Sequence, residues 1–269
     1  ANGVDAASAG IEVLETLRQE PVFFGAGQFD EEVLATIGDP LARIENSIDG
    51  LPSVEGISGD IPYWILPRRS RIEFFRRARE FERAAQGSVK GARQGLDLLL
   101  GDSVTRVFLA VTNPAEKRGV QGIIGQYAVL NLSNGKIEKV SSGSNTDLVD
   151  PSSLPEGLSA GYTSLFGESN PEWVNMTLSP FADDAARQMS AAWEQQSGEK
   201  VDAVVLMDTV ALAELVSSTG GSITTQSGDR LQSPEEISKY LSNGIYFEFP
   251  EDNIARKEFQ SQQIGRAHV

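Results

Sequence analysis

The sequence contains no cysteine and only one histidine, His268, which is next to the last residue. Without thiols the chain cannot form disulfides, thiolate nucleophiles, iron–sulfur clusters or cysteine-ligated zinc sites. A single histidine also excludes Ser-His-Asp triads and metal sites built from several histidines. Any catalysis must therefore come from carboxylate, amide, hydroxyl, lysine and arginine side chains.

Long apolar runs and positive charge are also scarce. No run approaches the roughly 20 apolar residues of a membrane-spanning helix, and the chain begins without a methionine or a signal-like segment. We therefore expect any membrane segment to lie outside these 269 residues. The 23 lysines and arginines against 38 acidic residues give a formal charge of −15. This charge argues against a nucleic-acid partner, because neutralising phosphates requires a clustered cationic surface.

Apolar periodicity predicts that residues 1–100 form an N-terminal helical region, either a hairpin or a small bundle. Apolar residues at steps of three and four cover 4–17, a second such pattern starts near Asp30, and a third covers 70–100. Residues 50–67 are rich in glycine, proline and serine, which predicts a connection between the second and third helices.

The predicted helix over 70–100 and the residues just before it carry the one basic cluster of the chain. Its members are Arg68, Arg69, Arg71, Arg76, Arg77, Arg79 and Arg83. A cluster of this kind is compatible with a membrane surface. Interleaved acids at Glu73, Glu80 and Glu82 instead favour an exposed helix face held by ion pairs, which is the interpretation we prefer.

Residues 101–269 are predicted to form an α/β domain. Two short apolar runs, 107–111 and 127–132, have the length of buried strands. The sequence Ser-Asn-Gly at 133–135 is a strong hairpin signal, and residues 136–140 alternate as a half-exposed strand does. The domain therefore begins with consecutive strands.

A polar loop lies between the first two strands. Residues 113–118 read Asn-Pro-Ala-Glu-Lys-Arg. They are followed by glycines at which the backbone can turn sharply or approach a ligand: Gly119, Gly122 and Gly125. A carboxylate (Glu116), a guanidinium (Arg118) and two amides (Gln121 and Gln126) make this loop the place to look for a site. The plainer alternative is an ion pair between Glu116 and Arg118 that ties the loop, with Asn113 capping a turn and the two glutamines satisfying backbone groups.

The later segments complete the predicted fold. Residues 151–180 are expected to form a long loop whose aromatic residues lay it over the core, and 181–196 a helix. A strand, a helix and a strand over 201–208, 210–217 and 222–225 predict a crossover and a sheet with parallel pairs. We therefore predict an α/β fold, a mixed sheet flanked by helices and preceded by the helical region.

Two further segments bring charge toward the predicted site. Residues 141–145 are expected to be flexible, and Asp147 follows them at the sheet edge that also carries Glu116. A final helix over 252–269 presents Arg256 and Lys257. We expect these charged side chains to meet at one mouth of the sheet.

These motifs resemble a known family. The loop at 113–118, the Gly-Ile-Ile-Gly at 122–125 and the strands around them are similar to a family of unknown function found in cell-envelope proteins of Gram-positive bacteria. The segment at 200–212, KVDAVVLMDTVAL, and the Thr-Gly-Gly turn at 219–221 resemble the same family. The likeness covers residues 98–257 approximately.

That family in turn resembles, distantly, the LytR-CpsA-Psr phosphotransferases, which move glycan from a polyprenyl pyrophosphate carrier onto the cell wall. The resemblance implies an extracellular, membrane-anchored domain in which arginines hold the pyrophosphate and acidic residues hold a divalent metal. On this sequence it implies catalytic roles for Glu116, Arg118 and Asp147, with magnesium on Glu116 and Asp147. Implied substrate contacts come from Asn113, Arg118, Gln121, Gln126, Arg256 and Lys257.

Two departures from those enzymes keep a second hypothesis open. Asn113 stands about where they carry a metal-binding aspartate, and the turn at 144–147 lacks an arginine beside its aspartate. The first hypothesis is an envelope domain that binds a polyprenyl-linked or glycan phosphate and transfers it. The second is a non-catalytic scaffold or binding module for cell-wall glycan or other envelope proteins, and a plain glycan-binding domain is a third. The sequence does not decide whether the chain is an enzyme.

Overall fold

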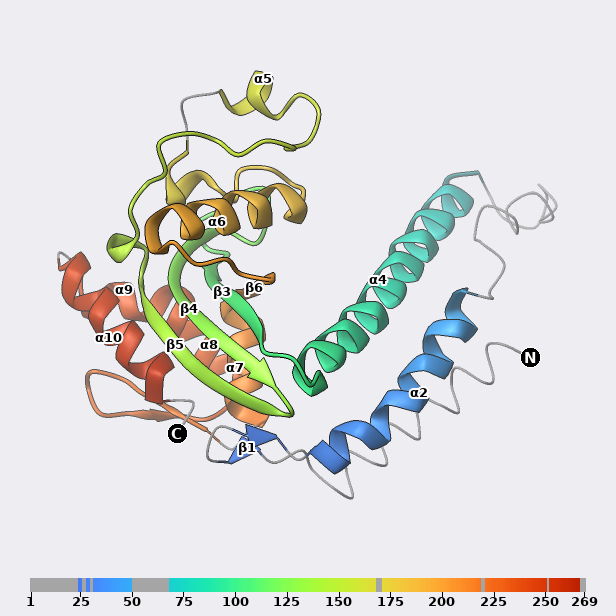
Figure 1. The fold of residues 1–269 in the computed structure, drawn as a ribbon, viewed down its shortest axis with the longest axis horizontal. Helices are drawn as coiled ribbons and strands as arrows, with labels where there is room; N and C mark the ends of the chain where they lie inside the picture. The colour runs from blue at the N-terminus through green and yellow to red at the C-terminus, as the bar shows by residue number, and fades with distance from the viewer. Residues whose placement is uncertain are drawn as a thin grey trace. The chain divides into compact units, whose positions relative to one another are not determined.

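The computed structural model describes residues 24–25, 28–29, 31–49, 68–167, 171–218, 221–250 and 252–266. The predicted helix over 4–17 and the connection over 50–67 lie outside these residues. The chain divides into two compact units, one made of residues 1–23 and 29–102 and the other of residues 24–28 and 103–269 (Figure 1). Two helices, α2 (Glu31–Asp49) and α4 (Arg68–Leu100), belong to one unit, and the sheet with its covering helices forms the other.

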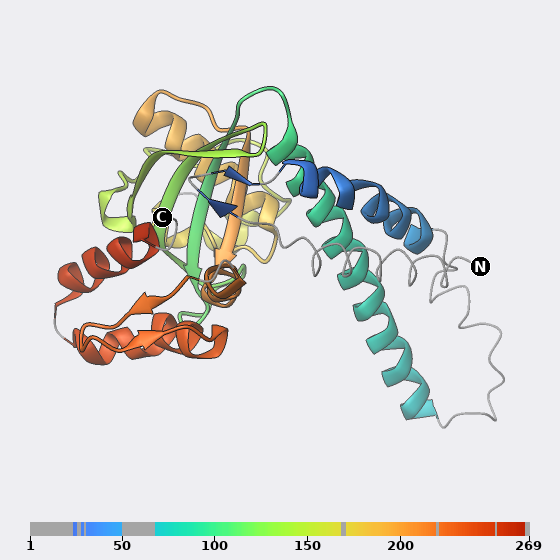
Figure 2. The same cartoon turned by 90° about the horizontal axis from the view of Figure 1, so that it is seen from below.

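The helical unit contains two helices that contact each other, with the start of α2 beside the end of α4 (Figure 2). Leu96 of α4 is buried, and its Cδ2 lies 3.7 Å from the position that a Cβ on Gly38 of α2 would take. An ion pair joins Arg93 Nη1 to Glu45 Oε2 at 3.5 Å. Helix α2 continues through Pro40. Within the described residues, no helix has the length and apolar character needed to cross a membrane.

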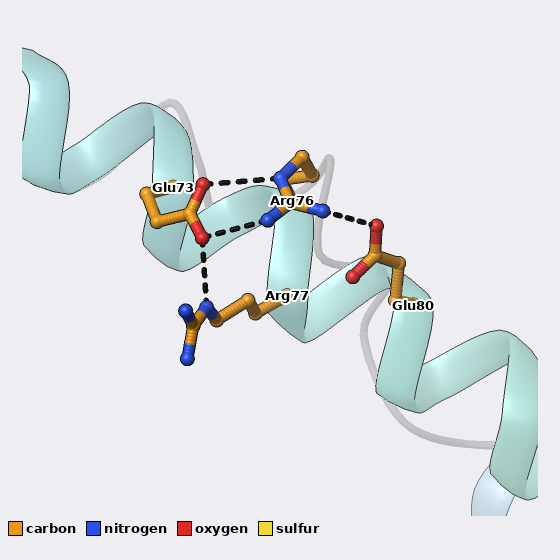
Figure 3. A network of polar contacts seen from close by, with 4 residues as sticks. All are labelled: Glu73, Arg76, Arg77 and Glu80. Carbon is orange, nitrogen blue, oxygen red and sulfur yellow. Dashed lines mark hydrogen bonds and ion pairs between the residues drawn. The ribbon is translucent and has the colours of Figure 1, made fainter.

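The outer face of α4 carries a network of ion pairs (Figure 3). Arg76 pairs with Glu73 at 2.7 Å and with Glu80 at 2.6 Å, while Arg77 pairs with Glu73 at 2.8 Å. Hydrogen bonds from Arg76 and Arg77 lower the pKa of Glu73 to about 2. Because these side chains are exposed, water screens the attraction and the pairs add little stability. The predicted ion-paired face is confirmed for these four residues.

Four main strands form the centre of the sheet in the second unit. They are β3 (Thr105–Asn113), β4 (Ile123–Ser133), β5 (Lys136–Ser144) and β6 (Ala203–Asp208), in the spatial order β5-β4-β3-β6. Two short strands, β1 (Phe24–Gly25) and β2 (Gln28–Phe29), extend the sheet beyond β5. Strand β3 pairs antiparallel with β4 and parallel with β6, so the sheet is mixed, as predicted.

The hairpin between β4 and β5 follows the sequence signal. Asn134 and Gly135 have φ angles of 48° and 72°, the left-handed conformation that a type I′ turn needs at both central positions. The expectation of a flexible segment at 141–145 is wrong, because Ser141 and Ser144 pair with Val129 and Gln126 of β4. Strand β4 is long enough to satisfy the backbone of these serines despite their low strand propensity.

The crossover predicted from 201–225 is also wrong in one respect. Helix α7 (Thr209–Ser218) follows β6, but the next strand, β7 (Ile223–Thr224), pairs with β8 (Arg230–Leu231) in a separate sheet. Ile223 is fully buried in the cluster that contains Leu212 and Val216 of α7. The parallel pair of the fold is instead β3 with β6.

Helices cover both faces of the sheet, which confirms the predicted fold class (Figure 1). Helix α6 (Ala182–Ser197) packs on the face that carries Phe108. The opposite face, around Val111, is covered by α7 and by the segments that follow it. These are α8 (Pro234–Lys239), the π-helix η3 (Tyr240–Gly244), α9 (Ile245–Glu248) and α10 (Asn253–Arg266).

The long loop after β5 is laid over the core, as predicted. It contains two short helices, α5 (Tyr162–Phe166) and η2 (Trp173–Asn175). Trp173 is 1% exposed and stacks on Phe108 with ring centroids 5.5 Å apart. The indole nitrogen of Trp173 donates to the carbonyl of Val149, so the buried ring leaves its polar atom satisfied.

Candidate functional site

A cavity of about 280 Å³ opens in the sheet unit where β3 ends and β4 begins. Its apolar wall includes Val111, Ile124 and Leu212, from two strands and α7. Its polar side chains come from β3, β4 and the loop between them, from the turn after β5, and from helices α7, α9 and α10. Segments far apart in the sequence therefore supply one small, half-polar cavity, the usual form of a ligand site.

One tyrosine links the loop to the covering helices. Asn113 Nδ2 donates to the hydroxyl of Tyr246 at 2.9 Å, and that hydroxyl donates to Glu116 Oε1 at 2.9 Å. The other side of the Asn113 amide, Oδ1, accepts from the backbone N–H of Ala115 at 3.0 Å and caps the turn. Part of the plainer sequence interpretation is thus correct, since Asn113 caps a turn. Glu116, however, bonds Tyr246, and within the described residues it forms no ion pair with Arg118.

Helix α10 brings two cations to the cavity. The guanidinium carbon of Arg256 lies 3.9 Å from the centroid of the Tyr246 ring, in a cation–π contact. Lys257 Nζ donates to Asn145 Oδ1 at 2.6 Å, and Asn145 Nδ2 donates to the carbonyl of Ile124 at 2.9 Å. Asn145 therefore anchors the lysine to the sheet.

The electrostatics of the cavity follow from burial and from these neighbours. Burial lowers the pKa of Lys257, and the adjacent Arg256 lowers it further, while Glu116 and Asp147 oppose the change. Burial also raises the pKa of Tyr246, and its hydrogen bond to Glu116 acts in the same direction. The charged side chains that line the cavity are two cations and one carboxylate. Their field favours an anionic ligand.

Two buried side-chain oxygens on lining residues have no hydrogen-bond partner in the part of the chain that the structure describes. They are Gln126 Oε1 and Thr112 Oγ1. The Gln126 amide nitrogen is engaged, because it donates to the carbonyl of Lys257 at 3.2 Å. Buried polar groups are normally paired, so these two atoms require an explanation.

Five residues named from the sequence line the cavity together. They are Asn113, Glu116, Gln126, Arg256 and Lys257. Arg118 and Gln121 are exposed and are not among the lining residues. Arg118 Nη1 donates to the neighbouring Lys117 carbonyl at 3.5 Å, while Gln121 takes a positive φ of 51° in the turn.

Asp147 lies beside the cavity and does not line it. Its Oδ2 accepts from the backbone N–H of Ser144 at 2.7 Å and caps the short helix η1 (Asn145–Asp147). Within the described residues there is no group of three or more acidic or histidine side chains that could hold a metal. Glu116 and Asp147 are both engaged in hydrogen bonds, and the ammonium of Lys257 lies in the field of both. Magnesium on these two carboxylates stays a prediction.

The three loop glycines have different roles. A Cβ on Gly119 would collide with the backbone of Leu178, and one on Gly122 with the carbonyl of Asn113. Gly122 also has a φ of 95°, so both glycines serve the fold. A Cβ on Gly125 would come no closer than 3.9 Å to the oxygen of Val111, and Gly125 lines the cavity. Of the three loop glycines, Gly125 alone has room for a Cβ, and that room adjoins the cavity.

Sequence reasoning missed Tyr246, Asn145 and Thr112. The signal for Asn145 was present, since an asparagine directly after a strand can bond a neighbouring backbone group. Tyr246 had no local signal, because its role depends on a helix that returns to the sheet 133 positions after Asn113. Thr112 is one residue of a buried strand, where threonine is common.

Comparison with known proteins identifies a family. No curated protein and no solved structure matches the chain. The sequence profile of a family described as "Protein of unknown function (DUF4012)" matches residues 102–246, which is more than half of the chain. The match includes the β3–β4 loop and Tyr246 and ends before α10. The predicted likeness to a family of unknown function is confirmed, whereas the likeness to LytR-CpsA-Psr enzymes stays a prediction. The chain belongs to the DUF4012 family.

Proposed function

We propose that the sheet unit binds a polyprenyl-linked or glycan phosphate in this cavity, at the extracellular face of the cell membrane. One observation carries the proposal: Arg256 and Lys257 both line a single cavity in a chain whose formal charge is −15. Burial lowers the pKa of Lys257, and repulsion from the adjacent Arg256 lowers it further. A bound phosphate would relieve this repulsion.

The two cations have complementary roles in the proposal. Arg256 offers planar, bidentate donors to phosphate oxygens, and the Tyr246 ring beneath it fixes its orientation. Lys257 offers a compact charge whose position is set by Asn145. The apolar wall formed by Val111 and Leu212 gives the carbon skeleton of the ligand a place next to the phosphate.

Binding without turnover is the form of the proposal that the Glu116 contact favours. Its carboxylate accepts a hydrogen bond from Tyr246, whose raised pKa keeps the phenol protonated as a donor. Transfer would require Glu116 to exchange this partner for the attacking hydroxyl. The envelope location and the partners, cell-wall glycan or other envelope proteins, rest on the family resemblance alone.

A binding experiment tests the proposal. Isothermal titration calorimetry measures the affinity of inorganic pyrophosphate and of geranyl pyrophosphate for the wild type and for Arg256→Gln. The substitution is expected to weaken both ligands about tenfold, the typical effect of losing a charge-assisted bond. The matched control is Arg118→Gln, which removes an exposed arginine outside the cavity and is expected to change affinity less than about twofold.

Two outcomes would count against the site. If the wild type binds neither ligand, the phosphate-binding function is wrong. If Arg118→Gln weakens binding and Arg256→Gln does not, the ligand binds on the β3–β4 loop, as the sequence alone suggested, and the cavity is not the site. Melting curves of both variants confirm that a loss of affinity is not a loss of fold.

A second experiment separates transfer from binding. Wild type and Glu116→Gln are incubated with a polyprenyl-pyrophosphate-linked sugar as donor, cell-wall glycan as acceptor, and magnesium, and the carrier phosphate that transfer releases is measured. Absence of turnover by the wild type, together with binding, supports the non-catalytic module. Turnover that is abolished in Glu116→Gln would remove that interpretation and support a phosphotransferase.

A further inference from the structure

The charged side chains that line the cavity come from two different elements. Arg256 and Lys257 belong to α10, whereas Glu116 belongs to the loop between β3 and β4. Tyr246 links the two groups, because its ring lies 3.9 Å from the guanidinium carbon of Arg256 and its hydroxyl donates to Glu116 at 2.9 Å. The cationic end of the cavity and its carboxylate are therefore separated by a single tyrosine side chain.

The carboxylate of Glu116 is accessible to a ligand. The two unpaired oxygens of Gln126 and Thr112 are buried, but Glu116 is exposed and lines the cavity. Its Oε1 accepts from Tyr246, and within the described residues Glu116 forms no ion pair. An ionised carboxylate has about four acceptor positions, so the bond to Tyr246 leaves others for a ligand.

A ligand that is only an anion matches one end of the cavity and not the other. A phosphate held by Arg256 and Lys257 places negative charge near Glu116, and like charges repel. An ammonium group on the same ligand turns this repulsion into attraction. Glu116 would then disfavour simple anions as well as bind the correct ligand, which is how many sites obtain specificity.

The size of the cavity indicates that the two ligand charges lie close together. At about 280 Å³ the cavity is at the lower end of the range of ligand pockets, about 300–1,000 Å³. Only one tyrosine side chain separates the protein groups that would bind them. A phosphate and an ammonium group on neighbouring carbon atoms suit this spacing.

We infer that the cavity selects an aminoalkyl phosphate, a phosphate ester with an ammonium group on the next carbon, and that Arg256 and Lys257 hold its phosphate while Glu116 holds its ammonium. Two sources share this chemistry: the ethanolamine headgroup of a phospholipid and the 1-phosphate of an amino sugar. The inference rests on the proposed function and narrows it, because it names the group that the phosphate carries.

The test compares ligands that differ in one charged group. Phosphoethanolamine and ethyl phosphate share a phosphate and a two-carbon chain, but only the first carries an ammonium group, which is charged at about pH 7. In titration calorimetry the wild-type chain should bind phosphoethanolamine about fivefold more tightly than ethyl phosphate. This is the upper end of the effect of an ion pair with an exposed carboxylate.

A substitution of Glu116 shows whether its charge causes the preference. Glu116→Gln keeps an oxygen acceptor for Tyr246 and removes the charge, so the preference should fall below about twofold. Ethyl phosphate should bind this variant about two to three times more tightly than it binds the wild type, because the repulsion is gone. Damage to the fold would instead weaken both ligands. Weaker binding of ethyl phosphate to the variant would therefore contradict the inference.

The matched control is Glu156→Gln, which removes an exposed carboxylate that does not line the cavity. This variant has the same net charge as Glu116→Gln and should keep the full wild-type preference. If it loses the preference as well, the preference comes from the overall charge of −15 and the role of Glu116 is overturned.

Two further ligands identify the source of the aminoalkyl phosphate. Glucosamine 1-phosphate represents the amino sugar, with glucose 1-phosphate as its uncharged counterpart at the amino position. Glycerophosphoethanolamine represents the phospholipid headgroup in soluble form. Whichever of the two aminoalkyl phosphates binds more tightly indicates the source, and either order supports the inference, provided that Glu116→Gln reduces the binding.

The outcomes separate the two proposals. Equal binding of phosphoethanolamine and ethyl phosphate by the wild type overturns the selection of an aminoalkyl phosphate and leaves phosphate binding intact. Failure of every phosphate ligand to bind, inorganic pyrophosphate included, overturns both the inference and the proposed function.

Discussion

Arg256 stacks on the ring of Tyr246, with 3.9 Å between the guanidinium carbon and the ring centroid, while the hydroxyl of the same tyrosine bonds Glu116. The ring of Tyr246 therefore positions the guanidinium of Arg256, and its hydroxyl positions the carboxylate of Glu116. Because Asn113 donates to the same hydroxyl, Tyr246 also ties α9 to the end of β3. The geometry of the cavity depends on this residue more than on any residue of the β3–β4 loop.

Two substitutions at Tyr246 separate its face from its hydroxyl. Tyr246→Phe keeps the ring under Arg256 and loses both hydrogen bonds, so it should lower the free energy of unfolding by about 1 kcal/mol and change pyrophosphate affinity less than about twofold. Tyr246→Leu removes the ring as well, and the freed arginine should weaken affinity about tenfold. Urea unfolding and calorimetry measure the two effects. Equal weakening by both variants would show that the hydroxyl matters and the cation–π contact does not.

Protonation of Lys257 should accompany ligand binding. Its pKa is lowered by burial and by Arg256, against the opposing effect of Glu116 and Asp147. Between this lowered value and the ordinary 10.5, the folded state binds fewer protons than the unfolded state. The charged lysine therefore reduces stability below its folded-state pKa, and stability recovers as the pH rises toward 10.5.

A bound phosphate reverses this shift, because an anion stabilises the ammonium form. Binding should therefore take up protons at pH values between the lowered pKa and the ordinary 10.5, and affinity should fall as the pH rises through that range. Calorimetry in two buffers of different ionisation enthalpy measures the uptake. The proton uptake should disappear in Lys257→Met and persist in the control Lys200→Met. Lys200 is exposed and does not line the cavity. Burial raises the pKa of Tyr246, which moves its titration to higher pH and away from that of Lys257.

Local patterns predicted the elements of the fold well. Alternation and turn chemistry identified the β4–β5 hairpin, where Asn134 and Gly135 adopt the conformation that their residue types favour. The capping residues of α8 are equally local: Ser233 and Glu236 form a capping box, and Pro234 opens the helix. These signals can be predicted because they act over four residues or fewer.

The composition of the site could be predicted only in part. Glu116, Arg256 and Lys257 were expected at one mouth of the sheet, and they line one cavity. Arg118 was expected with them, but nothing in the sequence shows whether a loop side chain turns inward or outward. Tyr246 was missed because its partners are 130 or more positions away in the chain.

The loop glycines give a matched pair of substitutions that separates fold from site. Gly122→Ala should destabilise the unit by more than about 2 kcal/mol, because Gly122 has a φ of 95° and its Cβ would meet the Asn113 carbonyl. Gly125→Ala makes the same chemical change in open space and should leave stability unchanged or raise it by up to about 1 kcal/mol. Gly125→Val should further narrow the cavity and weaken pyrophosphate binding. Unchanged affinity in Gly125→Val would contradict a ligand beside β4.

The loop over the core should detach in acid, because one buried aspartate holds it. Asp184 of α6 is 2% exposed, and its carboxylate accepts from the hydroxyls of Ser159 and Ser179, each at 2.6 Å. Burial alone would raise the pKa of Asp184, but these bonds and the Ser159 N–H outweigh it, so the pKa is lowered. Its contribution to stability is therefore complete above the ordinary pKa of 3.8 and is lost as the pH falls through the lowered value.

Asp184→Asn should lower the unfolding free energy by about 2 kcal/mol at neutral pH and flatten its acid dependence. The control is Asp183→Asn, at an exposed position in the same turn, which should change neither the free energy of unfolding nor its dependence on acid pH. If this control also flattens the acid dependence, the effect comes from the charge at the start of the helix and not from the loop.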